Sequence, residues 1–329
     1  MLILARKFQL KHILLALVAL ILIGNLGAAV APNYSLLLLA RFISGIPHGA
    51  YFGVGTIVSD KLADKGKGSQ AIALMVSGMT IANLFGVPLC TWLSVALSWR
   101  ITFLLIGCWS IITLLFIAKW VPRVPGLPDN GFKGQFRFLK SPAPWLLIGA
   151  VLLGNGGVFA WYSYINPLLR DVSDFDPHVI TFLMVLAGLG MVVGNLTGGV
   201  LSDRYNPAKV ASLTQISIGA TLLLIFFLSP VSWLSVLLMM VCTTGLFALS
   251  SPQQILIIRY SKGGEMLGAA CVQIAFNLGN AIGAYCGGLT LHAGLDCRYP
   301  SLVGVPFALT GCLLLYIFYK RYSFVHYGR

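Results

Sequence analysis

Charged residues are scarce in this chain. They make up 9% of the 329 residues, whereas hydrophobic residues make up 58% and the mean hydropathy is +0.88. A soluble domain carries roughly 25% charged residues, because charged groups cover the surface that faces water. The shortage of charge argues against a soluble enzyme, a disordered chain or a disulfide scaffold. It indicates instead that lipid covers much of the surface.

Acidic residues are the scarcest charged class, and none lies in the middle of a long apolar run. The nine acids are Asp60, Asp64, Asp129, Asp171, Asp174, Asp176, Asp203, Glu265 and Asp296. An intramembrane carboxylate is the usual proton relay or cation ligand of a membrane protein. The sequence also lacks HExxH and C-x-x-C patterns, so it supports neither a zinc site nor protease chemistry. We expect no enzyme activity, no metal and no cofactor.

What the chain does have is a series of long apolar runs. About 20 apolar residues cross the hydrocarbon core of a bilayer as a helix. Ten segments have roughly that length: 12–30, 36–57, 72–96, 101–119, 144–168, 179–200, 210–229, 232–258, 267–291 and 302–319. The predicted fold is an all-α polytopic membrane bundle of about ten transmembrane helices. Residues 1–120 hold four of them, 121–143 form a linker, and 144–329 hold six.

The net charge of +13 comes from basic residues that alternate with these spans. Eighteen Lys and Arg residues fall on the side of the N-terminus, three (Arg100, Arg170 and Arg298) fall on the opposite side, and Arg41 lies within a span. Because basic loops remain in the cytoplasm, both termini and the linker are predicted to be cytoplasmic. Membrane insertion therefore explains the charge, and we expect no nucleic-acid partner.

Glycine is abundant, with 36 residues placed mostly within the apolar runs. Gly190, Gly194 and Gly198 recur every four residues, as do Gly279, Gly283 and Gly287, in two later spans. Small residues at this spacing lie on one face of a helix and let a neighbouring helix approach closely. Both ridges predict tight helix contacts within a packed bundle.

Three stretches resemble signature motifs of the major facilitator superfamily. Arg41-x3-Gly45 resembles the motif of the family's fourth helix, and the segment from Gly78 to Gly86-Val-Pro88 resembles a degenerate fifth-helix antiporter motif. Residues 199–209 resemble the cytoplasmic loop motif between the eighth and ninth helices. Phrases such as SGIPHGAYFGVG and GAACVQIAFNLGNAIGAYCGG look like those of arabinose-efflux-type permeases among the drug and sugar proton antiporters. The resemblance covers essentially the whole chain.

This resemblance implies a secondary active transporter of the bacterial-type inner membrane. Such a protein exports arabinose-like sugars or related small molecules by alternating access, and it uses the proton motive force and no cofactor. The resemblance also implies a monomer in the bilayer with a small-molecule substrate. Family members have twelve helices, so ten spans imply an N-terminally truncated chain without the first two. Alternative hypotheses are a transport-inactive fragment, the product of a misassigned start, and multidrug efflux.

Two basic residues of the second span are candidates for the substrate cavity. Arg41 and His48 are seven residues apart and so share a helical face. A charged residue in a span is expected to point into the bundle, where Arg41 would bind substrate, couple to a proton, or fix helix packing through backbone carbonyls. His48 can titrate near neutral pH or serve as a packing residue.

Two stripes of polar residues have helical spacing. They are Asn155, Tyr162 and Asn166, and then Gln273, Asn277 and Asn280. Amide and phenol groups suit a neutral hydroxylated ligand such as a sugar, whereas the same groups also form hydrogen bonds between helices. Gln253 and Gln254 are similar but weaker candidates.

Two further sets are candidates for conformational change. Gly78, Gly86 and Pro88 are expected to bend their helix, because proline removes a donor and glycine allows close approach. In the family this bend is associated with antiport, and a simple packing kink is the alternative. Asp203 with Arg204 is predicted to form a gate whose charge-assisted bonds break as the halves rock. The alternative is a helix-end anchor.

Overall fold

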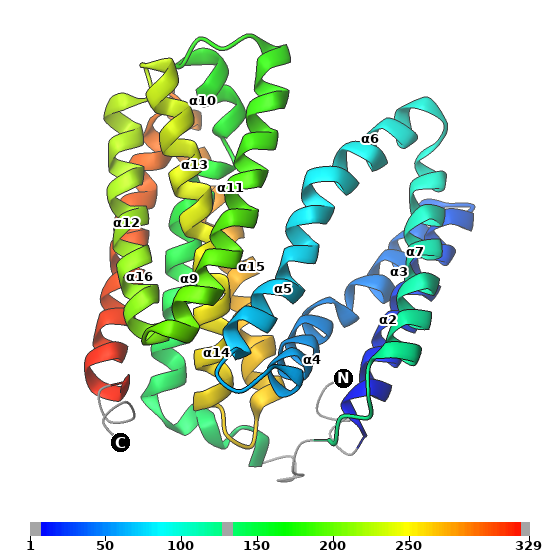
Figure 1. The fold of residues 1–329 in the computed structure, drawn as a ribbon. Helices are drawn as coiled ribbons and strands as arrows, with labels where there is room; N and C mark the ends of the chain where they lie inside the picture. The colour runs from blue at the N-terminus through cyan, green and yellow to red at the C-terminus, as the bar shows by residue number, and fades with distance from the viewer. Residues whose placement is uncertain (1–7, 127–133, 324–329) are drawn as a thin grey trace.

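The computed structural model describes residues 8–126 and 134–323 of the chain (Figure 1). Within these two stretches every regular element is helical and no strand occurs, which confirms the all-α prediction. Residues 127–133 of the predicted linker lie outside the described residues, as do Arg6 and Lys7.

The helices before the linker form what we call the first group. They are α2 (Leu10–Val30), α3 (Tyr34–Gly45), α4 (Pro47–Leu62), α5 (Gly68–Ile81), the π-helical turn η1 (Ala82–Gly86), α6 (Val87–Ala96) and α7 (Trp99–Trp120). The helices after it form the second group. They are η2 (Arg137–Lys140), α9 (Pro142–Tyr162), α10 (Ile165–Asp171), α11 (Pro177–Arg204), α12 (Pro207–Leu228), α13 (Ser232–Ala248), α14 (Ser250–Tyr260), α15 (Glu265–His292), α16 (Tyr299–Phe318) and η3 (Tyr319–Ser323).

Polar side chains fix where several helices begin. The Asn33 side chain accepts a hydrogen bond from the Leu36 N–H at the start of α3, and Asn206 accepts one from the Ala208 N–H at the start of α12. These caps satisfy amides that have no partner in the first turn of a helix. Helices α3 and α12 therefore begin at polar residues in the connections between apolar runs.

Nine helical segments of the described residues are long and apolar enough to cross a membrane. The one predicted span that is not among them, 36–57, is divided between α3 and α4, which have 12 and 16 residues. Pro47 lacks the N–H of a normal helical residue and so interrupts the hydrogen-bond ladder, yet Ile46 keeps helical angles of φ −52° and ψ −46°. Together α3 and α4 run from residue 34 to 62, which exceeds the roughly 20 residues that a crossing needs.

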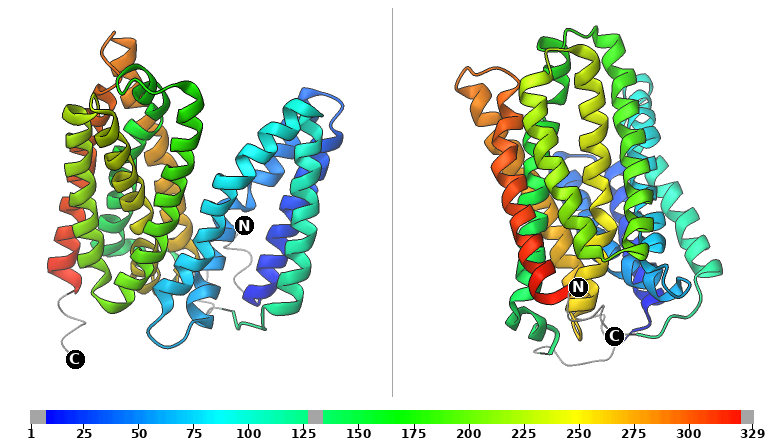
Figure 2. Two further views of the ribbon diagram at one scale, coloured as in Figure 1. Left: turned by 45° about the horizontal axis from the view of Figure 1, so that its top comes forward. Right: turned by 60° about the vertical axis from the view of Figure 1, so that its left-hand side comes forward.

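The two groups diverge toward one end of the bundle and meet at the other (Figures 1 and 2). We call the end where they meet the lower end, and α2 begins and α16 ends there. At this end α5 packs against α11 and α14, and α4 packs against α15. Ile72 and Val76 of α5 join Ile255 of α14 in a small buried core, so apolar burial helps to hold the groups together.

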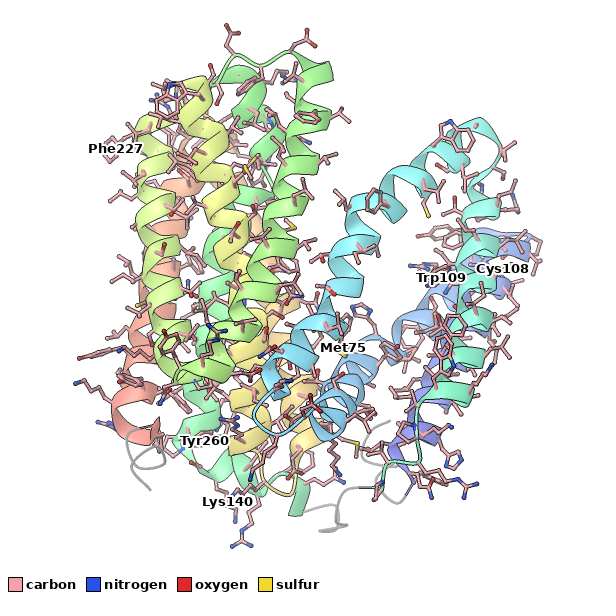
Figure 3. The ribbon with its side chains drawn as sticks, viewed as in Figure 1. Met75, Cys108, Trp109, Lys140, Phe227 and Tyr260 are labelled. Atoms are coloured by element: carbon pink, nitrogen blue, oxygen red, sulfur yellow. The ribbon has the colours of Figure 1, made fainter. Side chains whose placement is uncertain are left out.

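Each group also has an apolar core of its own. In the second group it includes Trp161, Leu222 and Leu315, and in the first group it includes Leu17 and Val54. Many large apolar side chains remain on the outside, such as Phe227 on the outer face of α12, which is 63% exposed (Figure 3). Lipid tails are as apolar as these side chains, so this surface suits a bilayer.

The two glycine ridges lie in helix contacts, as the sequence predicts. A Cβ added to Gly283 of α15 would overlap the backbone carbonyl oxygen of Gly156 in α9, and one added to Gly194 of α11 would overlap that of Thr244 in α13. Backbones approach this closely only where no side chain separates them. The prediction of tight contacts along both ridges is confirmed.

Candidate functional site

A pocket lies between the two groups of helices. The second group lines it with Val151, Asn155, Leu246, Phe247, Ser250, Gln253, Gln254, Val272, Gln273 and Phe276, and the first group with Phe52, Val76 and Met79. Its volume is about 40 Å³, which is room for a few water molecules at about 10–15 Å³ for each. A larger guest therefore requires movement of the walls.

Four carboxamides line this pocket: Asn155, Gln253, Gln254 and Gln273. All four are buried. The Asn155 side chain donates to the Val151 carbonyl of its own helix at 2.9 Å, but Gln253 Nε2 and Gln254 Oε1 bond to no other group of the described residues. Leaving such a buried amide group unpaired costs roughly 1–3 kcal/mol. One amide donor and one amide acceptor among the lining residues are therefore unpaired in this conformation.

The two walls of the pocket differ in chemistry. All four carboxamides come from the second group, whereas the first group presents apolar side chains. None of the described lining residues carries a charge. Since an ion in such a place would have no counter-charge, the pocket suits a neutral guest with hydroxyl groups on one side.

Several predicted residues lie in or beside the pocket. Asn155 and Gln273 line it. His48 lies next to it, because its ring packs edge-on against the pocket residue Phe52 with 5.2 Å between centroids. Gly49 also faces the Gln273 side chain, since a Cβ added there would lie 3.9 Å from Gln273 Cγ. The structure thus brings His48 and Gln273 to the same region from opposite groups.

Arg41 makes its contacts elsewhere, within the first group. Its Nη1 donates to Asn25 Oδ1 of α2 at 3.3 Å, and its guanidinium lies 5.1 Å from the ring centroid of Phe103 in α7. Asn25 is held in turn by a bond from its Nδ2 to the Ile21 carbonyl at 2.8 Å. In this conformation Arg41 ties α3 to two neighbouring helices and does not line the pocket.

The first predicted polar stripe is interrupted. Helix α9 ends at Tyr162 and α10 starts at Ile165, with a break at Ser163 and Tyr164. The spacing from Asn155 to Asn166 assumed one unbroken helix, so this part of the prediction is wrong. Asn166 is exposed, and Tyr162 is partly buried against Phe159, with 5.6 Å between ring centroids.

The residues of the second stripe lie on one unbroken helix, α15, and one of them bonds within that helix. The Asn277 side chain donates to the Gln273 carbonyl at 2.9 Å and is exposed. Asn280 Oδ1 is buried without a hydrogen-bond partner among the described residues. Of the three stripe residues, Gln273 is the one that lines the pocket.

The predicted bend lies where α5 gives way to α6. The five residues from Ala82 to Gly86 form a π-helical turn directly before Val87 and Pro88. Such turns absorb an interruption of the normal helix ladder, which Pro88 causes. The prediction that these glycines allow close approach of another helix is wrong for this conformation. No described atom lies within 4 Å of a Cβ added to Gly78, and at Gly86 the one described atom within that distance belongs to Ala82.

Asp203 joins the two groups at the lower end. Its carboxylate oxygens accept hydrogen bonds from the Ser69 and Gln70 N–H groups, each at 2.9 Å. These amides belong to the first turn of α5, where the positive end of the helix dipole favours an anion. Of the two residues predicted to form a gate, Asp203 binds a helix N-terminus of the first group, and Arg204 is exposed.

Asp60, in the last turn of α4, lies beside the same helix start. Its carboxylate packs against Gly68, the first residue of α5. Burial raises the pKa of Asp60, and the neighbouring charge of Asp203 raises it further, whereas Arg259 of α14 opposes the shift. Protonation of Asp60 is therefore easier here than in water.

Gln253 and Gln254 are more central than the sequence indicates. They lie in the second turn of α14, after the interruption at Leu249 that separates α13 from α14. The phrase Ser250-Ser251-Pro252 is the local signal, because proline favours the first turn of a helix. The apolar side chains Phe52 and Met79 carry no such signal, since nothing local distinguishes them from ordinary core residues.

Comparison with known proteins agrees with this architecture. The sequence model described as Major Facilitator Superfamily matches residues 2–269 and 166–326. The chain belongs to the major facilitator superfamily. It is therefore a multi-pass membrane transporter for small molecules and not an enzyme.

Relatives of this transporter are known in several bacteria. It is 49% identical over 317 residues to the putative transporter AraJ of Escherichia coli K12, covering 96% of this chain and 80% of AraJ. It is 31% identical to the E. coli inner membrane transport protein YdhP, covering 93% and 79%. It is 27% identical to a probable sugar efflux transporter of Helicobacter pylori, covering 100% and 82%.

Solved structures share the transporter's fold. FucP in the outward conformation has a TM-score of 0.78 at 16% identity, covering 95% of this chain and 84% of FucP. A bacterial homologue of the iron transporter ferroportin in an outward-facing state has a TM-score of 0.74 at 15% identity, covering 97% and 85%. The described arrangement, with contacts gathered at the lower end, is thus one that transporters of this family adopt.

Proposed function

We propose that this transporter exports small neutral sugars or related hydroxylated molecules, in exchange for protons, by alternating access. The relatives named a probable sugar efflux transporter and the putative transporter AraJ support the direction and the substrate class. The pocket supports the same substrate class independently of any relative.

The observation that carries the proposal is the uncharged, amide-lined wall of the pocket. Among the described residues, the donor Gln253 Nε2 and the acceptor Gln254 Oε1 have no hydrogen-bond partner, and both side chains are buried. A sugar hydroxyl both donates and accepts, so it satisfies either group, whereas an apolar drug satisfies neither. Phe52 and Phe276 line the same pocket and supply apolar surface for the C–H groups of a sugar.

Transport requires the two groups to separate at the lower end. In the described conformation the Asp203 bonds to α5 and the Ile72–Val76–Ile255 core hold that end together. Opening breaks these contacts and gives the pocket the additional volume that a sugar needs. Closing restores them after the substrate has entered from the lower side.

We assign the exchanged proton to His48. Histidine titrates near neutral pH, and His48 packs on Phe52 at the pocket wall. Protonation there places a positive charge beside an uncharged cavity. Water solvates this charge better than a neutral guest does, so protonation favours release of the guest. Replacement of His48 by Gln is expected to leave sugar exchange intact and to remove its dependence on a pH gradient.

We further propose that the lower end faces the cytoplasm of a bacterial inner membrane. Of the described basic residues, Lys61, Lys65 and Lys67 lie in or beside the α4–α5 loop at the lower end, whereas Arg100 lies at the opposite end. Positively charged loops remain on the cytoplasmic side. A fluorescent protein fused to the C-terminus is expected to fluoresce in cells, while a fusion that requires export is expected to stay inactive.

The test is transport by the purified chain in proteoliposomes. Radiolabelled arabinose is expected to move against its gradient when a pH gradient is imposed, and the Gln253→Leu/Gln254→Leu variant is expected to lose this transport. Transport of a cationic dye in place of the sugar would show multidrug efflux. No flux of any substrate above that of empty liposomes would show an inactive fragment.

A further inference from the structure

The face of α11 that meets α5 carries a second contact above Asp203. Asn195, Gly199 and Asp203 recur every four residues and so lie on one face of α11. Asn195 is fully buried, and its Nδ2 donates to the Ala73 carbonyl of α5 at 2.6 Å. This bond joins the two groups, as the Asp203 bonds do.

The Asn195 bond lies inside the membrane, whereas the Asp203 bonds lie at its edge. Eight residues separate the two side chains along α11, which is about 12 Å at 1.5 Å per residue. Asn195 falls within the apolar segment that crosses the membrane, and Asp203 is next to the last residue of α11. No water competes for the Asn195 amide while α5 covers it.

The chemistry of the contact fixes which atom of the amide points toward α5. A backbone carbonyl only accepts hydrogen bonds, so the Asn195 nitrogen must face Ala73. Asn195 Oδ1 is buried with no partner among the described residues. The side chain is therefore held by its bond to the opposite group and not by a network within its own group.

Gly199 makes this bond possible. A Cβ added at Gly199 would lie 2.7 Å from the Ala73 Cβ and 3.0 Å from the Ser69 carbonyl oxygen. Because residue 199 has no side chain, α11 approaches α5 closely enough for the short Asn195 side chain to reach the Ala73 carbonyl. The three residues together set the position of one helix on the other.

We propose that Asn195 is an intramembrane latch of the lower end, which must break together with the Asp203 contact before the transporter opens to that side. The proposal rests on alternating access within the proposed function, but not on the identity of the substrate. It makes Asn195 a positioning residue for the conformational change and not a substrate ligand.

The experiment compares variants of the full chain in lipid nanodiscs by hydrogen–deuterium exchange and mass spectrometry. Asn195→Leu is expected to raise the exchange of the first turns of α5 about fivefold, in keeping with one lost interhelical hydrogen bond. The exchange of the upper ends of α6 and α11 is expected to fall, because opening below closes the bundle above. Thr197→Val is the matched control, since Thr197 bonds to the Val193 carbonyl of its own helix and is exposed.

Two further results decide the outcome. Asp203→Asn is expected to raise exchange at the same turns of α5, and the double variant is expected to exceed both single variants. Equal exchange in Asn195→Leu and the wild type would overturn the proposal, as would increased exchange at both ends, which indicates general loosening. The readout needs no substrate, so failure of sugar transport in liposomes leaves this test unaffected.

Discussion

Glycines within the helices have different surroundings in the two groups of helices. In the second group, Gly279, Gly283 and Gly287 of α15 press against the backbone of α9. In the first group, Gly78 precedes a π-helical turn that ends at Gly86, and a Cβ at Gly78 would meet no described atom within 4 Å. A glycine ridge therefore permits close packing, but a neighbouring helix must lie across it before the ridge contributes to stability.

The largest effect is expected from replacing a covered glycine. Gly283→Ala places a methyl group on the Gly156 carbonyl, so the helices must separate, which costs about 2 kcal/mol. Gly283→Leu is expected to prevent folding. Thermal unfolding in detergent measures the difference. Gly78→Ala is the control, and equal destabilisation of both variants would contradict this comparison between the two groups of helices.

The next effect concerns the contact between the groups. Asp203→Ala removes two charge-assisted hydrogen bonds to α5 and is expected to shift the equilibrium toward an open lower end by about 2 kcal/mol. Hydrogen exchange at Ser69 and Gln70 measures the shift. Asp64→Ala is the matched control, because Asp64 is exposed and pairs only with the nearby Lys67 at 3.0 Å. A similar shift in that variant would argue for a general charge effect.

A smaller effect distinguishes the two walls of the pocket. Gln253→Leu on the polar wall is expected to raise the KM for sugar about tenfold, which matches the loss of one hydrogen bond. Met79→Leu on the apolar wall conserves volume and is expected to change the KM by less than about twofold. Transport assays in proteoliposomes give the KM of both variants. A larger increase in KM for Met79→Leu than for Gln253→Leu would show that the first group determines substrate binding.

The smallest effect is expected from pH at the lower end. The pKa of Asp60 is raised while the groups are together, chiefly by burial, and it falls toward the ordinary value when they separate. The closed lower end thus binds the proton more tightly, so lowering the pH through this window favours closure and raising it favours opening. Distances between spin labels at Lys65 and Lys262 report the change, and Asp60→Asn is expected to abolish it.

Local sequence patterns predicted the fold better than the site. Apolar length and caps such as Asn33 and Asn206 depend on neighbours in the chain, so the helices follow from them directly. The break after Tyr162 was missed, because Ser163 and Tyr164 do not differ from ordinary helical residues. Asn155 and Gln273, which the sequence singles out by their polarity within apolar runs, line the pocket.

The long-range partners were beyond local patterns. Arg41 carries an intramembrane charge that the sequence assigned to a cavity, yet it bonds to Asn25, sixteen residues away. Asp203 was predicted, together with Arg204, to form a gate, but the sequence did not identify its partners Ser69 and Gln70, which lie more than 130 residues away. Such pairings depend on how helices cross, and residue spacing along one helix carries no information about that.

The backbone partners of Asp203 have a consequence for how this closure tolerates change. A salt bridge is lost when either of its side chains is replaced. Asp203 instead accepts hydrogen bonds from two main-chain amides, and every residue except proline provides such an amide. Substitutions at Ser69 and Gln70 therefore leave the docking surface for the carboxylate in place. Substitution of Asp203 removes the contact. On the α5 side the two amides remain as long as the helix forms and neither residue is replaced by proline.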